Sequence, residues 1–169
     1  MKIVVIGAGN VGFETAKLLS LKGNNDILLV ARNLPDYLEN YMNKRTNVHF
    51  LKGDATDEAD MIKILNSELV SRWEKIDTLF CTIATDSKLT AVDNFKIFKE
   101  TFETNYFSNI VPVKVFIKKM FEGSNIVITS ASSGSHASKH LRAYSPSKWA
   151  LENTSTSLRA ELRSRKIKV

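Results

Sequence analysis

The sequence predicts an α/β domain built on a parallel β-sheet with helices on both faces. Five short apolar runs predict strands, and segments with helical spacing of apolar residues lie between them. The runs lack polar alternation, which is typical of strands that are covered on both faces. Alternating strands and helices indicate right-handed βαβ units and therefore a parallel sheet. The predicted strands are 3–6, 27–31, 48–51, 78–83 and 126–130, and the predicted helices are 11–21, 58–66, 93–120 and 146–163.

Length and composition are those of one ordinary globular domain spanning residues 1–169, with 43% hydrophobic and 25% charged residues and no linker. The single cysteine, Cys81, excludes an internal disulfide framework. No leader peptide and no apolar run of membrane length is evident, so we expect a cytoplasmic protein without a membrane partner. The net charge of +6 suits an anionic ligand but is too small to indicate a nucleic-acid partner. No metal-ligand pattern is evident, so we expect no metal site.

Two connections are less regular than the others. Residues 34–42 are weakly helical and carry Pro35 near their start. The long helical stretch 93–120 contains Pro112, which removes a backbone donor. We therefore expect a helix that bends at this proline.

A glycine turn follows the first predicted strand, where residues 7–12 read G-A-G-N-V-G. The spacing G-x-G-x-x-G allows a tight turn, close approach of the backbone to a pyrophosphate, and close packing of helix against strand. The pyrophosphate then meets free N–H groups at the helix N-terminus. The turn predicts a doubly wound, Rossmann-type sheet and a dinucleotide site at Gly7, Gly9, Asn10, Val11 and Gly12.

The end of the second predicted strand bears on the choice of cofactor. NAD-binding sites of this type have an acidic residue there, whereas this chain has Arg32 and no carboxylate. An arginine fork binds a 2′-phosphate, which a carboxylate would repel. The sequence therefore favours NADP(H), with NAD(H) as the alternative.

The strongest chemical signal is Tyr144, followed four residues later by Lys148. On a helix the two side chains share one face, so the ammonium can stabilise a tyrosine phenolate. Such a phenol can exchange a proton with an alcohol or a carbonyl near neutral pH. An isolated pair with this spacing is more often a solvated surface pair, so other positions must support the assignment.

Those positions exist, because the chain resembles the short-chain dehydrogenase/reductase family from Met1 to Val169. The family's catalytic tyrosine and lysine fall on Tyr144 and Lys148, and its helix asparagine falls on Asn105. The resemblance also implies cofactor contacts at Asp54, Ala55 and Ala84, besides Tyr144 and Lys148. Asp54 matches the family's adenine-contacting acid after the third strand.

The catalytic serine has two candidates. The usual family spacing counted back from Tyr144 reaches Ala131, which has no hydroxyl. If the strand residues before it are matched to the family by the face of the sheet on which they lie, the serine falls on Ser130. The loop that follows is then one residue longer than usual. Ser132 is the alternative.

Three features depart from the family pattern. The glycine turn is one residue shorter than usual. Cys81-Thr82-Ile83-Ala84 stands where the family has Asn-Asn-Ala-Gly, so we expect the hydrogen bonds of those asparagines to be missing. The chain also ends where the family's sixth strand begins, so we expect the C-terminal strands to be absent and the chain to be truncated.

The resemblance implies an NADP(H)-dependent oxidoreductase that transfers hydride between a nicotinamide and a small carbonyl or alcohol substrate. It also implies a homodimer or tetramer formed through the helices that carry Asn105 and Tyr144. Activity of these 169 residues alone stays open. The alternatives are a non-catalytic NADP(H)-binding or redox-sensing module, or an inactive fragment.

Overall fold

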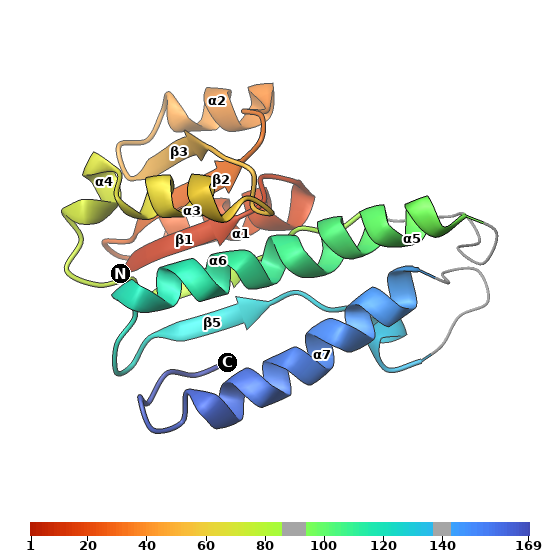
Figure 1. The fold of residues 1–169 in the computed structure, drawn as a ribbon. Helices are drawn as coiled ribbons and strands as arrows, with labels where there is room; N and C mark the ends of the chain where they lie inside the picture. The colour runs from red at the N-terminus through yellow and green to blue at the C-terminus, as the bar shows by residue number, and fades with distance from the viewer. Residues whose placement is uncertain (86–93, 137–142) are drawn as a thin grey trace.

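A computed structural model describes residues 1–85, 94–136 and 143–169. Its sheet has five parallel strands in the order β3-β2-β1-β4-β5 (Figure 1). The observed strands lie within two residues of those predicted, and the runs of β1 and β2 are buried between two helical layers. They are β1 (Lys2–Ile6), β2 (Asp26–Ala31), β3 (Val48–Lys52), β4 (Thr78–Cys81) and β5 (Asn125–Ile128).

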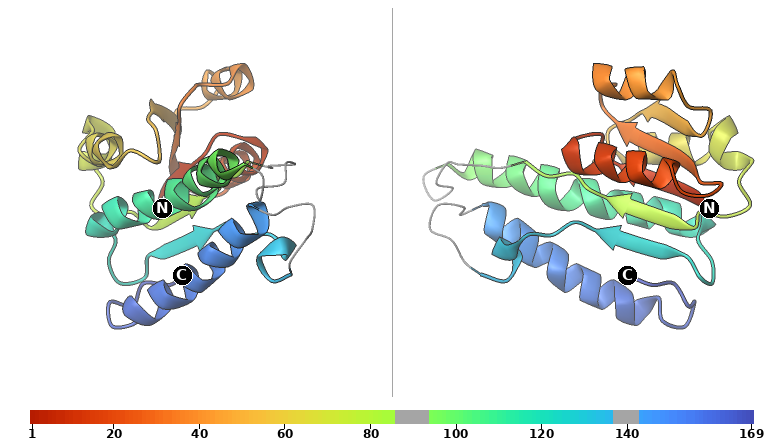
Figure 2. Two further views of the ribbon diagram at one scale, coloured as in Figure 1. Left: turned by 45° about the vertical axis from the view of Figure 1, so that its right-hand side comes forward. Right: turned by 180° about the vertical axis from the view of Figure 1, so that it is seen from behind.

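Helices cover both faces of the sheet, as Figures 1 and 2 show. Helices α1 (Asn10–Ser20) and α2 (Asp36–Met42) pack on one face. The helices on the other face are α3 (Glu58–Leu65), α4 (Glu68–Ser71), α6 (Ser108–Phe116) and α7 (Tyr144–Glu161). The doubly wound arrangement predicted from the sequence is confirmed.

The two faces of β1 carry two separate hydrophobic cores. Val4 and Ile6 pack with α3, α4 and α6, whereas Ile3 and Val5 pack with α1 and α2. All four side chains are at most 1% exposed. Successive strand residues point to opposite faces, so a continuous apolar run is what a strand covered on both sides requires.

The topology reverses at β1. From β1 the chain crosses to β2 and β3 on one side of the strand, then to β4 and β5 on the other. Ligands of open α/β sheets bind at such a switch point, outside the carboxyl ends of the strands. The glycine turn follows β1 at this end.

The long helical stretch is irregular. Helix α5 (Phe95–Phe102) passes into a π-helix, η1 (Glu103–Phe107), and then into α6. Pro112 lies inside α6, one turn after the end of the π-helix. The π-helix lies immediately before Ser108, whose carbonyl the ring of Pro112 would meet in a regular helix, so the wider turns take up the distortion there.

Two short 3-10 turns, η2 (Ile117–Lys119) and η3 (Ser132–Gly134), flank β5. The last residues of the chain lie beside this strand. The N–H of Ile126 donates to the carbonyl of Lys168 at 2.8 Å, and the N–H of Lys168 donates to Ser124 at 3.0 Å. Lys168 forms one parallel bridge with Asn125. Within the described residues, this bridge is the only strand-like pairing on the outer side of β5.

Candidate functional site

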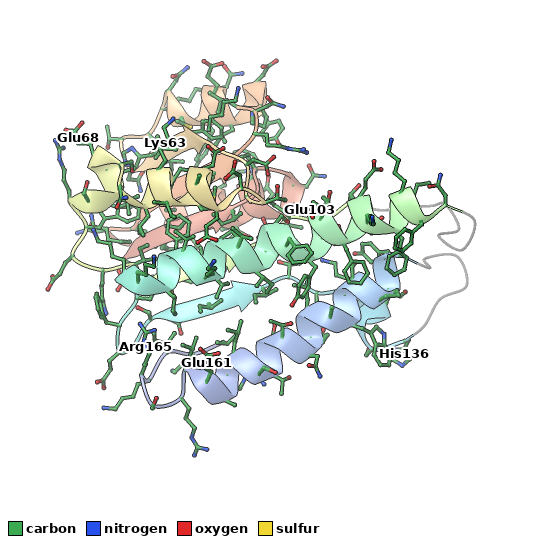
Figure 3. All side chains as sticks on the ribbon, viewed as in Figure 1. Lys63, Glu68, Glu103, His136, Glu161 and Arg165 are labelled. Carbon is green, nitrogen blue, oxygen red and sulfur yellow. The ribbon has the colours of Figure 1, made fainter. Side chains whose placement is uncertain are left out.

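A cavity of about 390 Å³ lies at the carboxyl ends of the strands, where the switch point predicts a ligand. It is lined by the glycine turn, the ends of β2, β3 and β4, and the π-helix. Figure 3 shows Glu103 at the junction of α5 and α6, on the side of the glycine turn. The lining residues are Gly7, Ala8, Gly9, Ala31, Arg32, Gly53, Asp54, Ala55, Thr56, Thr82, Ile83, Ala84, Glu103, Thr104 and Ser108.

A larger cleft, about 640 Å³, lies at the opposite end of the strands and contains none of the predicted site residues. Its acidic residue, Asp26, accepts hydrogen bonds from Lys2 (3.0 Å), His49 (2.7 Å) and Trp73 (3.0 Å). Those bonds join the amino ends of β1, β2 and β3 to the segment after α4. This cleft therefore has a structural explanation, and the smaller cavity remains the candidate site.

The glycines of the turn have different structural reasons. Gly7 has a φ of +103°, which favours glycine. A Cβ at Gly12 would lie 1.9 Å from the Gly7 carbonyl oxygen, so Gly12 lets α1 pack against the turn. Gly9 has a φ of −72°, and a Cβ there would meet no atom within 4 Å. Nothing in the fold requires glycine at position 9, whereas close approach of a ligand would.

Arg32 and Asp54 both line the cavity, at the ends of β2 and β3. Asp54 accepts hydrogen bonds from the N–H (2.9 Å) and the hydroxyl (2.8 Å) of Thr56. The backbone bond is the main reason why the pKa of Asp54 lies below its usual range, and the nearby charge of Arg32 lowers it further. Arg32 itself is exposed, so its guanidinium is accessible to an anion.

The end of β4 is held by side chains that the sequence did not single out. The hydroxyl of Thr82 donates to the carbonyl of Ile6 at 2.8 Å. Asn109 donates to the carbonyls of Ile83 (2.9 Å) and Asn105 (2.7 Å). The chain has no asparagines in this segment, and the hydroxyl of Thr82 and the side chain of Asn109 provide hydrogen bonds here instead.

Asn105 joins the β4 loop to α7. Its Oδ1 accepts from the N–H of Thr85 at 2.7 Å, and its Nδ2 donates to the Thr85 carbonyl at 3.1 Å. The same Nδ2 donates to the hydroxyl of Ser147 at 3.1 Å, and Ser147 donates to the carbonyl of Tyr144 at 2.6 Å. The side chain of Asn105 is fully buried. It therefore connects the cavity wall to the first turn of α7.

Tyr144 and Lys148 share one face of α7. The Nζ of Lys148 lies 5.7 Å from the centroid of the Tyr144 ring and donates to the carbonyl of Thr129 at 3.0 Å. Lys148 is only 1% exposed, and burial lowers its pKa to about 8. A buried ammonium beside a phenol favours the phenolate over the neutral hydroxyl.

The two candidate serines differ in environment. The hydroxyl oxygen of Ser130, directly after β5, is buried and has no hydrogen-bond partner among the described residues. Ser132 begins η3 and is exposed. A buried polar atom without a partner is rare in a protein interior, and a catalytic role is one of its explanations.

The described residues contain no group of three His, Cys, Asp or Glu side chains suited to a metal ion. Within residues 1–85, 94–136 and 143–169, no helix is both long and apolar enough to cross a membrane.

Comparisons with known proteins agree with this arrangement. No curated protein matches the chain in sequence. Solved structures with similar folds include serine dehydrogenase from Escherichia coli, at 17% identity with a TM-score of 0.88, covering 99% of this chain and 79% of that one. Sorbitol-6-phosphate 2-dehydrogenase from Erwinia amylovora has 22% identity and a TM-score of 0.88, covering 99% and 68%. NAD⁺-bound xylitol dehydrogenase has 23% identity and a TM-score of 0.90, covering 99% and 67%.

These identities support the fold alone, and the chain is shorter than each of the three structures. Membership rests on the family model for short chain dehydrogenases, which matches residues 1–169. The chain therefore belongs to the short-chain dehydrogenase family.

Proposed function

We propose that the chain forms the cofactor-binding and catalytic part of an NADP(H)-dependent oxidoreductase that acts on a small carbonyl or alcohol. The observation that carries the proposal is a chain of hydrogen bonds between the wall of the candidate cofactor cavity and the helix that carries the candidate proton donor. The cavity beside the glycine turn reaches the π-helix, and Asn105 connects that helix to Ser147, between Tyr144 and Lys148. The candidate cofactor cavity and the candidate proton donor thus lie at the same end of the sheet and are linked by hydrogen bonds.

The residues present fit a dinucleotide. The space beside Gly9 and the N-terminus of the 11-residue helix α1 suit a pyrophosphate. The ionised Asp54 suits the adenine amino group, and Arg32 suits a 2′-phosphate. The nicotinamide, when bound, donates or accepts the hydride.

The remaining chemistry falls to side chains of this protein. In the reductive direction Tyr144 donates its hydroxyl proton to the carbonyl oxygen, which becomes the alcohol oxygen. Lys148 stabilises the resulting phenolate through its positive charge. The unpartnered hydroxyl of Ser130 polarises the same oxygen, and Asn105 orders the helix junction through which a water-mediated proton relay reaches Lys148.

Cofactor preference provides the test. NADPH is expected to raise the melting temperature more than NADH at equal concentration and salt, because only NADPH carries the phosphate that Arg32 can bind. Arg32→Ala is expected to remove most of the difference, and thermal shift measures it. Arg72→Ala is the matched control, since Arg72 pairs with Glu68 at the opposite end of the strands.

Equal shifts with both cofactors would remove the NADP(H) assignment, and no shift with either would contradict the proposal. NADPH binding without reduction of any carbonyl in a broad panel would favour a non-catalytic binding module instead.

We further propose that two copies pair through the helices that carry Asn105 and Tyr144. Phe95 is 68% exposed, Phe107 44% and Trp149 51%, and they lie on α5, η1 and α7. Exposed aromatic side chains on neighbouring helices are typical of an interaction surface. Light scattering at micromolar concentration is expected to give a dimer or larger, and Trp149→Ser is expected to weaken it. A monomeric mass for the unmodified chain would contradict this pairing.

A further inference from the structure

Tyr37, in the first turn of α2, contacts the glycine turn directly. Its hydroxyl donates to the carbonyl oxygen of Ala8 at 2.5 Å. Its ring packs against Phe13 of α1, with the ring centroids 4.8 Å apart. Helix α2 is therefore fastened both to α1 and to the backbone between the first two glycines.

This contact fixes the direction of a backbone donor. The carbonyl of Ala8 and the N–H of Gly9 belong to one peptide group, which is planar and trans, so they point in opposite directions. Holding the oxygen toward α2 therefore turns the Gly9 N–H away from α2. Gly9 lines the 390 Å³ cavity, and its own carbonyl accepts the Phe13 N–H at 2.8 Å as α1 begins. Both peptide groups that flank Gly9 are thus held in place.

We infer that Tyr37 is a positioning residue for pyrophosphate recognition, whose hydroxyl keeps the Gly9 N–H aimed at the cofactor's pyrophosphate. The inference rests on the proposed function and adds a second role for the segment after β2. Arg32 binds the 2′-phosphate itself, whereas Tyr37 acts on the pyrophosphate through the peptide of Ala8 and Gly9. The segment after β2 therefore contributes to the recognition of both the 2′-phosphate and the pyrophosphate.

The test compares two tyrosines of the same helix. Tyr37→Phe keeps the ring on Phe13 and removes only the hydroxyl. Tyr41→Phe is the matched control, because its ring also meets Phe13, at 5.7 Å, while its hydroxyl bonds to Ser20 at 2.7 Å, at the far end of α1. Dissociation constants are measured for NADPH and for adenosine 2′-phosphate, which has the 2′-phosphate but no pyrophosphate.

Tyr37→Phe is expected to weaken NADPH binding about fivefold, the effect of one lost hydrogen bond, and to leave adenosine 2′-phosphate binding unchanged. Tyr41→Phe is expected to change neither. Unchanged NADPH affinity in Tyr37→Phe would overturn the inference, as would an equal loss for both ligands, which would indicate a general structural role. Failure of the unmodified chain to bind NADPH would instead overturn the proposed function and the inference with it.

Discussion

Tyr144→Phe is expected to lower the rate of NADPH-dependent carbonyl reduction by about three orders of magnitude while NADPH affinity stays within about twofold. The substitution removes the proton donor but keeps the ring beside the Lys148 ammonium, 5.7 Å from its centroid. The measurement is the loss of the reduced nicotinamide's absorbance over a panel of aldehydes and ketones, paired with a binding titration.

Tyr106→Phe is the control for this variant. The Tyr106 hydroxyl forms a hydrogen bond with Thr154 of α7 (3.0 Å), so this variant loses a tyrosine hydroxyl that lies outside the proposed proton path. Its rate is expected to stay within about twofold of the unmodified protein. Reduction at the full rate by Tyr144→Phe would show that another group donates the proton.

The two serine variants extend the experiment. Ser130→Ala is expected to lower the rate nearly as much as Tyr144→Phe, and Ser132→Ala far less, because the Ser130 hydroxyl is buried without a partner among the described residues, whereas Ser132 is exposed. The reverse order would assign the carbonyl contact to Ser132.

Gly12→Ala is expected to lose stability, whereas Gly9→Ala is expected to lose affinity for NADPH. At Gly12 the new Cβ would lie 1.9 Å from the Gly7 carbonyl oxygen and 2.8 Å from the Thr82 hydroxyl, so the turn and α1 must move apart. We expect a loss of about 3 kcal/mol in the free energy of unfolding and a fall of about 10 °C in melting temperature.

Gly9→Ala has no such clash, and its φ of −72° suits alanine. Its melting temperature is therefore expected to stay within about 2 °C of the unmodified chain. NADPH affinity is expected to fall tenfold or more, because the methyl group enters the space assigned to the pyrophosphate. Scanning calorimetry and NADPH titration separate the two effects. A Gly9→Ala variant with full affinity would show that the pyrophosphate does not pass this residue.

The sequence predicted those parts of the fold that depend on local patterns. Each strand is a short apolar run, and α1 begins at Asn10, within the glycine motif, so periodicity and the turn motif placed them correctly. The spacing of Tyr144 and Lys148 likewise predicted that they share a helix face, because only the helical repeat is needed for that inference.

Contacts between side chains and distant backbone atoms were not predictable in this way. The Tyr37 hydroxyl bonds to a carbonyl 29 residues earlier, and the Thr82 hydroxyl to one 76 residues earlier. Such bonds follow from how the β2–α2 and β4 segments pack, and they leave no repeat in the sequence. The π-helix around Asn105 was missed for a similar reason, since Pro112 gave a local signal for distortion but not its position.

The most direct test of the account is an NMR titration of the isotope-labelled chain with NADPH. The account predicts the largest backbone amide shifts in the glycine turn (residues 7–12), at Arg32 and at Asp54–Ala55, all at the carboxyl ends of the strands. Absence of shifts at millimolar NADPH would contradict it. So would shifts confined to Asn25, Asn47 and Trp73, which line the cleft at the amino ends of the strands.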